Sequence, residues 1–156
     1  MKEKLKHYAK EISLFILVIT IFANVISIYK SQNLNNDVLS LQIIKPVNKP
    51  ILVHVWAVWC PICKAEADNI QRVSEYYAVI TIAVNSGDDT SIEKYMKENN
   101  LDFKFINDIN GKLAQELNVN AYPSTFIYDK DRNLVFSEVG YTSSIGLFLR
   151  MIWSSF

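Results

Sequence analysis

The chain has 156 residues, half of them hydrophobic, and its 16 basic residues balance its 16 acidic ones. This length is that of one ordinary domain, and the composition allows a sizeable buried core. A net charge of zero provides no electrostatic footprint for nucleic acid, which is therefore excluded as a partner. With only four glycines and four prolines, an all-β fold with many tight turns is disfavoured.

An uncharged, largely apolar run occupies residues 12–29 and follows a lysine-rich start. At about 1.5 Å per residue it would span roughly 27 Å, close to the hydrocarbon thickness of a bilayer. A buried core helix is the alternative, but such a helix should have a polar face, and this run has none. A cleaved signal peptide is the other alternative, but its apolar region is usually about 7–15 residues long and ends at a cleavage site of small residues. The sequence therefore favours a retained transmembrane anchor.

The lysines that precede the run set the expected topology, because positively charged flanks stay in the cytoplasm. Residues 1–11 are then a cytoplasmic N-terminus, residues 30–43 a polar linker, and residues 44–156 a folded domain. We expect a single-pass protein of the inner (cell) membrane whose folded domain lies on the periplasmic, extracytoplasmic side. Thiol–disulfide chemistry is in demand in that compartment.

The two cysteines of the chain, Cys60 and Cys63, lie where a predicted strand meets a predicted helix. The nearly continuous apolar run Ile51–Val58 is typical of a central strand buried on both faces. From Cys60 onward the apolar spacing becomes helical, and Pro61 suits a first helical turn, where its missing N–H costs nothing. We therefore expect an exposed Cys60 at the open end of the helix and a buried Cys63. A C-x-x-C pair in this context indicates redox chemistry, with two structural core cysteines as the alternative.

The remaining elements alternate between strand and helix. Thr90 and Glu93 have the spacing of a capping box for a helix that ends near Asn99, whereas the preceding pair Asp88–Asp89 is expected in a solvated turn. The order predicts an α/β fold, a mixed central sheet with helices on both faces. Its other predicted elements are strands at Ala78–Val84 and Phe103–Ile106, a helix at Gly111–Leu117, a hairpin of Thr125–Asp129 with Leu134–Val139, and a helix from a Thr142 cap to Trp153.

These features together resemble the thioredoxin superfamily. Within it, the chain is most similar to the membrane-anchored TlpA-like disulfide oxidoreductases, which include cytochrome c maturation and copper-sensitivity-suppressor proteins. The resemblance rests on the Trp59–Lys64 segment after a strand, the Tyr122–Thr125 segment before another, the hairpin that follows, and Gly140. It implies a thioredoxin fold for residues 44–156, with the transmembrane helix in front.

The resemblance also implies that Pro123 is a cis-proline facing the active site; an ordinary proline at the start of a strand is the alternative. Two departures from thioredoxin are visible. Pro61 and Ile62 separate the cysteines where thioredoxin has Gly-Pro, and His54 stands where thioredoxin has a buried aspartate.

The residues around the motif suggest distinct roles. A helix N-terminus favours a thiolate, so Cys60 is the expected nucleophile and Cys63 the resolving thiol. His54 is a candidate proton relay to Cys63, with a neutral imidazole that only fills space as the alternative. The expected contacts with a substrate protein are Trp59, Pro61, Ile62 and Tyr122.

The sequence therefore predicts a membrane-anchored thiol–disulfide oxidoreductase that needs no cofactor beyond the Cys60–Cys63 disulfide and no metal. Its expected partners are protein thiols and disulfides, a membrane electron-exchange partner, and the lipid bilayer through residues 12–29. The alternative is a copper(I)-binding module in which the two cysteines are soft ligands. A catalytically silent scaffold is a third possibility, against which the intact cysteine pair argues. The motif does not fix the direction of electron flow.

Overall fold

The computed structural model describes residues 8, 10–15, 17–18 and 48–156. Residues 10–15 are helical. Among the helices of the described ranges, none has both the length and the apolar character needed to cross a membrane. Most of the predicted span 12–29 and all of the predicted linker 30–43 lie outside these ranges, so both stay predictions.

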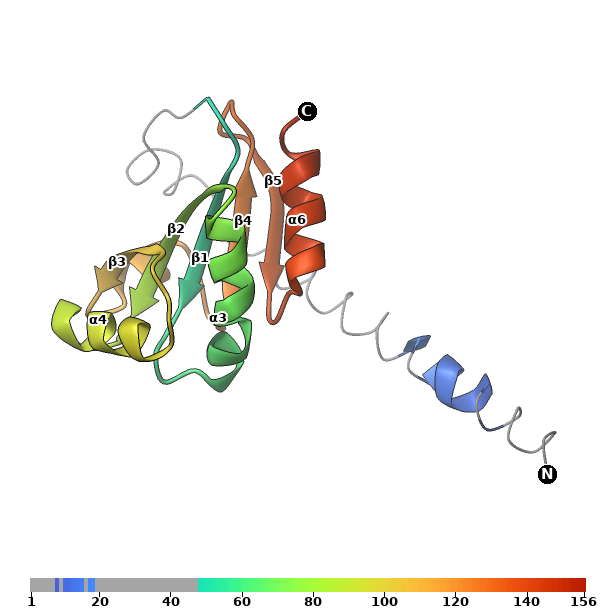
Figure 1. Cartoon of the computed structure of the whole chain (residues 1–156), viewed down its shortest axis with the longest axis horizontal. Coiled ribbons are helices and arrows are strands. Elements are labelled where there is room, and N and C mark those ends of the chain that lie inside the picture. Colours follow the sequence, from blue (N-terminus) through green and yellow to red (C-terminus); the bar gives the residue numbers. More distant parts are fainter. Residues whose placement is uncertain (1–7, 9, 16, 19–47) are drawn as a thin grey trace.

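A mixed five-stranded sheet with the order β3-β2-β1-β4-β5 forms the centre of the domain (Figure 1). Strand β1 lies in the middle, parallel to β2 and antiparallel to β4, and the outer pairs continue these directions. The predicted mixed sheet, central strand and hairpin are confirmed. The strands are β1 (Ile51–Trp56), β2 (Ala78–Val84), β3 (Lys104–Asp108), β4 (Ser124–Tyr128) and β5 (Leu134–Val139).

Helices cover both faces of this sheet, and each face has its own apolar core. One core is built with side chains of three helices, and in Figure 1 two of these, α3 and α6, lie side by side. The second core lies on the other face with the short helix α5. The predicted α/β architecture is therefore confirmed. The helices are α3 (Pro61–Ser74), α4 (Asp89–Glu98), α5 (Lys112–Glu116) and α6 (Ser144–Trp153).

Strand β1 is buried along its whole length, as its apolar run predicted. Successive side chains of a strand point to opposite faces. Leu52 and Trp56 accordingly join the core under α3, and Val53 and Val55 join the other. The strand ends two residues earlier than predicted because the chain turns before the motif, where the N–H of Cys60 donates to the carbonyl of Ala57 over 3.1 Å.

Two helix caps differ from the sequence prediction. Helix α4 is capped by Asp88, whose carboxylate accepts from the N–H of Ser91 at 2.8 Å, rather than by Thr90. Helix α6 is capped by Ser143 instead of Thr142. Asp, Ser and Thr all cap well, so a run of such residues does not show which one takes the position.

Candidate active site

The cysteine pair lies at the N-terminus of α3, as the sequence predicted. Cys60 is the N-cap residue, Pro61 occupies the first turn, and the Sγ of Cys60 accepts a hydrogen bond from the N–H of Cys63 at 3.2 Å. The two cysteines form a disulfide, with their Cα atoms 5.2 Å apart. Strand β1 and the turn after it deliver the pair to the open end of the helix, where unpaired N–H groups and the helix dipole favour negative charge.

The expected exposure of Cys60 is only partly met. Cys60 is 6% exposed and Cys63 1%, so Cys60 is the outer sulfur but is nearly buried. The reason is its neighbour across the site, since the Sγ of Cys60 lies 3.7 Å from the carbonyl oxygen of Tyr122. Cys60 is therefore the sulfur with the greater access to an attacking thiolate.

The loop before β4 forms the other side of the site, 62 residues further along the chain from Cys60. The Tyr122–Pro123 peptide bond is cis, the geometry that the resemblance implied for Pro123. The carbonyl of Pro123 accepts from the N–H of Gly140 at 2.8 Å, and Gly140 has a φ of 104°, which side-chain-bearing residues rarely adopt. Gly140 thus ties the end of β5 to the proline loop. The part that Pro123 plays in the chemistry stays a prediction.

An apolar rim surrounds Cys60. Trp59, Pro61 and Ile62 are exposed. The Trp59 ring stands at 89° to the ring of Tyr122, with their centroids 5.7 Å apart, and its Nε1 donates to the carbonyl of Asn85 at 3.1 Å. The four predicted substrate contacts, these three residues and Tyr122, are therefore gathered at one place. A fixed, exposed apolar rim is the kind of surface that a protein substrate can cover.

His54 lies in the middle of β1 and is fully buried. Its Nδ1 is 3.0 Å from the hydroxyl of Thr125 on β4, and burial lowers the pKa of the ring from 6.5 to about 3. By the alternation of the strand it points to the same side of the sheet as Leu52 and Trp56, which is the side of Cys63. The imidazole is therefore neutral at physiological pH. The proton relay to Cys63 stays a prediction.

The structure adds Glu66, which the sequence analysis did not single out. It lies one helical turn after Cys63, has no exposed surface, and accepts the N–H of Thr142 on Oε1 at 3.2 Å, while its Oε2 has no hydrogen-bond partner among the described residues. Burial, with a smaller contribution from the charge of Glu138, raises its pKa to about 8 against the opposing Thr142 hydrogen bond. Glu66 is therefore a protonated acid near neutral pH. The available signal was the helical spacing, because Glu66 lies three residues after Cys63 and next to Ala67, on the face of the predicted helix that the apolar residues share.

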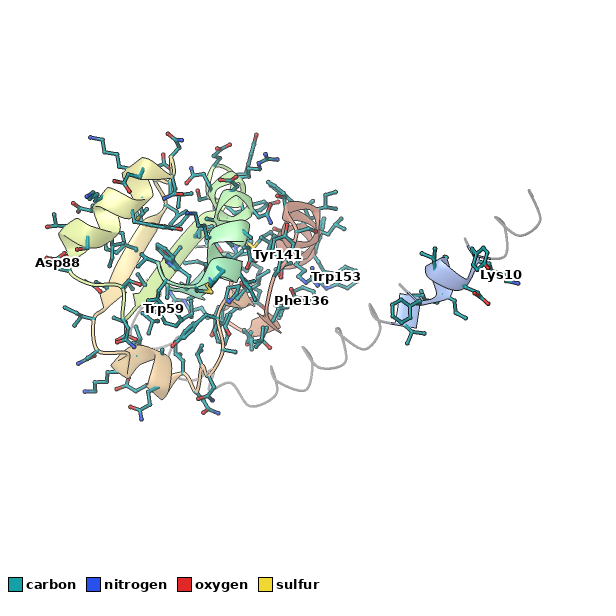
Figure 2. All side chains as sticks on the ribbon, turned by 90° about the horizontal axis from the view of Figure 1, so that it is seen from below. Lys10, Trp59, Asp88, Phe136, Tyr141 and Trp153 are labelled. Carbon is teal, nitrogen blue, oxygen red and sulfur yellow. A yellow bond between two sulfur atoms is a disulfide. The ribbon has the colours of Figure 1, made fainter. Side chains whose placement is uncertain are left out.

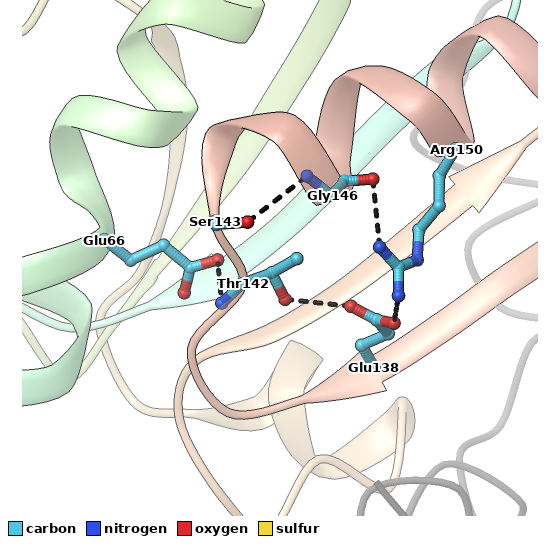
Figure 3. A network of polar contacts seen from close by, with 6 residues as sticks. All are labelled: Glu66, Glu138, Thr142, Ser143, Gly146 and Arg150. Atoms are coloured by element: carbon cyan, nitrogen blue, oxygen red, sulfur yellow. Dashed lines mark hydrogen bonds and ion pairs between the residues drawn. The ribbon is translucent and has the colours of Figure 1, made fainter. Parts of the chain in front are cut away.

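A polar network links Glu66 to the last helix (Figure 3). The hydroxyl of Thr142 donates to Oε2 of Glu138 at 2.8 Å, and Arg150 forms an ion pair with the other carboxylate oxygen. Arg150 also donates to the carbonyl of Gly146 at 2.9 Å. The network therefore joins β5 and α6 to the helix that carries the cysteines.

A copper(I) site at the cysteine pair would benefit from further ligands beside it. Across residues 48–156 and the described part of the N-terminus, no three His, Cys, Asp or Glu side chains are grouped so that they could hold a metal ion. Any metal at this site would rely on the two cysteines themselves.

Comparison with known proteins identifies the family. Residues 27–137 match the model of the AhpC/TSA family. The chain belongs to this thioredoxin-like family. A "Thioredoxin-like protein" of Haemophilus influenzae is 30% identical over 127 residues, which cover 80% of this chain and 74% of that protein. The "Thiol:disulfide interchange protein DsbE" of Pseudomonas aeruginosa is 36% identical over 84 residues, 53% of this chain and 46% of that protein.

Solved structures agree with this assignment. A secreted disulfide oxidoreductase of Mycobacterium tuberculosis, described as homologous to Escherichia coli DsbE, superimposes with a TM-score of 0.60 at 25% identity over 69% of this chain and 84% of that one. StoA from Bacillus subtilis gives a TM-score of 0.59 at 21% identity, with the same coverage, and supports the fold. The predicted membership of the thioredoxin superfamily is confirmed. Among the relatives, the interchange protein of Pseudomonas aeruginosa and a "Sporulation thiol-disulfide oxidoreductase A" of Bacillus subtilis carry thiol–disulfide activities in their names.

Proposed function

We propose that this chain is a membrane-anchored thiol–disulfide oxidoreductase that exchanges its Cys60–Cys63 disulfide with protein thiols and disulfides on the extracytoplasmic side. The observation that carries the proposal is the disulfide at the N-cap of α3, facing the Tyr122–Pro123 loop. The names of the relatives support the reaction type. The lysine-flanked apolar run at residues 12–29 supports the anchor and the side of the membrane.

The geometry supports a two-step exchange. In the reducing direction the thiolate of Cys60 attacks a substrate disulfide, forms a mixed disulfide, and releases one substrate sulfur as a thiolate. The thiolate of Cys63 then attacks the Sγ of Cys60, which closes the internal disulfide and releases the second substrate thiolate. Two electrons pass from this chain to the substrate, and the oxidising direction is the reverse.

A reversible role also fits the position of the disulfide better than a structural one. In the chain-entropy model, closing a loop of only four residues stabilises a fold by about 2 kcal/mol, against almost 5 kcal/mol for a loop of a hundred residues. The bond joins residues three apart, at the end of a helix that also packs Ala67, Ile70 and Val73 into the core.

The test is the reduction potential of the full chain, measured by equilibration in glutathione or dithiothreitol buffers, together with its copper(I) stoichiometry. We expect a reversible two-electron couple that Cys60→Ser abolishes. A potential of about −270 mV would indicate that the chain acts as a reductant, and a potential of about −120 mV that it acts as a disulfide donor. The absence of a reversible couple, with tight binding of one copper(I) per chain, would overturn the proposal in favour of a metal-binding module.

A further inference from the structure

Helix α6 is apolar on two opposite faces. Leu147 and Met151 are fully buried against the domain, while the outer face is exposed to solvent. A helix that is apolar all round is normally covered on every side. The exposed residues follow the helical repeat, and Phe156 lies three residues past the end of the helix. We call this set the outer stripe: Ile145, Leu149, Ile152, Trp153 and Phe156.

The outer stripe carries no charge. Arg150 is the only charged side chain between residues 143 and 156. It is folded back on Glu138, and its guanidinium lies 5.9 Å from the centre of the Phe136 ring. A solvent-facing helix normally bears charged residues on its outer side. The outer stripe therefore has the chemistry of a covered surface.

The outer stripe lies close to residues 48–50, where the segment that leads from the predicted membrane anchor enters the domain. A surface hollow of about 700 Å³ is lined by residues 48–50, where the chain joins the domain, by Tyr76 and Tyr77, and by Ser155 just after α6. The chain therefore joins the domain beside the C-terminal end of the outer stripe. Residues 30–47, which separate this point from the predicted membrane span, could reach at most about 65 Å when fully extended.

The aromatic residues at this end suit a lipid interface. Trp153 projects from α6 (Figure 2) and is 72% exposed, and Tyr76, which packs edge-on against Phe148, is equally exposed. Trp and Tyr are enriched where the headgroups of a bilayer meet its acyl chains. These residues lie at the end of the outer stripe that is nearest the point where the chain joins the domain.

We propose that the outer stripe of α6 docks into the interfacial layer of the bilayer that anchors the chain, an inference that rests on the anchoring in the proposed function. We expect the apolar rim around Cys60 to stay uncovered in this arrangement. Cys60 follows the far end of β1, and the six residues of that strand place it roughly 20 Å from the point where the chain joins the domain. Docking would hold the cysteines at a fixed height, ready for partners in or near the membrane.

The full chain offers a direct probe of this docking, because Trp153 can be separated from the other two tryptophans. Trp56 is buried, Trp59 belongs to the apolar rim around Cys60, and the first 47 residues contain no tryptophan. The oxidised chain is reconstituted in vesicles of phosphatidylcholine and phosphatidylglycerol with brominated acyl chains, and its tryptophan emission is compared with that in unbrominated vesicles. Trp153→Phe removes the reporter but keeps an apolar ring. Leu149→Asp places a charge on the outer stripe, and Ile109→Asp is a matched control at a position similarly exposed, outside the stripe.

We expect bromolipids to quench an emission component that Trp153→Phe lacks. Leu149→Asp should lower that component by about threefold or more, because a charge is costly in the interface, while Ile109→Asp leaves it unchanged. Equal quenching of the wild type and Trp153→Phe would overturn the docking. Protection of Trp153 from acrylamide without bromolipid quenching, rising with the protein-to-lipid ratio, would overturn it in favour of a second copy. Extraction of the chain by alkaline carbonate would overturn the anchoring itself, whereas a retained chain with an unquenched Trp153 would overturn the docking alone.

Discussion

The backbone N–H of Cys63 points at the Sγ of Cys60 over 3.2 Å, so the second cysteine of the motif positions a donor on the first. In the reduced protein this donor and the positive end of α3 both stabilise a thiolate on Cys60. The buried Cys63, at 1% exposure, has no comparable access to a substrate. The geometry thus assigns the two cysteines unequal roles.

This inequality predicts that Cys63→Ser accumulates a mixed disulfide between Cys60 and a substrate protein. Cys60→Ser keeps only the thiol of Cys63, and its mixed disulfide through Cys63 should be less abundant by about tenfold or more, because that thiol is buried. Non-reducing electrophoresis followed by mass spectrometry of the trapped species measures both. Equal trapping by the two variants would contradict the assignment.

The apolar rim predicts discrimination between protein and small-molecule disulfides. Trp59→Ala should slow the reduction of a protein disulfide such as that of insulin by roughly 3–10-fold, about 1 kcal/mol, because it removes an exposed aromatic contact beside Cys60. The rate with a small aromatic disulfide should change much less, since such a molecule needs only the sulfur. Stopped-flow rates with the two substrates check this, and Trp153→Ala on the outer stripe is the matched control. A parallel loss with both substrates would mean that Trp59 supports the fold rather than the contact.

Sequence reasoning located the motif, the strand that delivers it, and most of the elements around it. A nearly continuous apolar run predicted β1 and strong helical periodicity predicted α3, and the two-residue alternation predicted the exact bounds of β5. The cis bond at Pro123 came from the family resemblance alone, because the residue type does not determine the isomer.

What sequence reasoning missed depends on contacts between distant segments. Glu66 is a buried acid only because α6 packs beside α3 and brings the Thr142 N–H to its carboxylate, 76 residues along the chain. The near burial of Cys60 likewise depends on Tyr122. The caps Asp88 and Ser143 were missed for a local reason: Thr90 and Thr142 are also capping residues, although Asp and Ser, the stronger caps, took the positions.

The proton-relay hypothesis for His54 makes a kinetic prediction. If the imidazole moves a proton to or from Cys63, His54→Ala should slow the resolution of the mixed disulfide, while Thr125→Val, which removes the hydrogen-bond partner of the ring but keeps the imidazole, should slow it less. Quenched-flow measurement of mixed-disulfide decay separates the two variants. His54→Ala also leaves a cavity, so its unfolding free energy is measured in parallel. Unchanged decay in His54→Ala would contradict the relay hypothesis and support the alternative, in which a neutral imidazole only fills space. The lowered pKa of about 3 already favours that alternative.

Glu66 and His54 predict opposite pH dependences of stability. The pKa of Glu66 is raised from 4.5 to about 8, so the folded state holds a proton that the unfolded state has lost, and stability falls as the pH rises from about 4.5 to about 8. The pKa of His54 is lowered from 6.5 to about 3, so stability falls as the pH drops below about 6.5. Since one pKa unit corresponds to about 1.4 kcal/mol, each effect is on the order of a few kcal/mol.

The Glu66→Gln variant tests the first of these effects, because it keeps the shape and the Thr142 hydrogen bond but cannot ionise. Chemical denaturation between pH 5 and pH 9 should therefore show a loss of stability toward alkaline pH in the wild type that is much smaller in Glu66→Gln. Asp68→Asn on the same helix, an exposed carboxyl, is the control and should follow the wild type. Identical profiles for the wild type and Glu66→Gln would mean that the carboxyl is already ionised in the folded state at pH 5, and Glu66 could not then hold a proton one turn from Cys63.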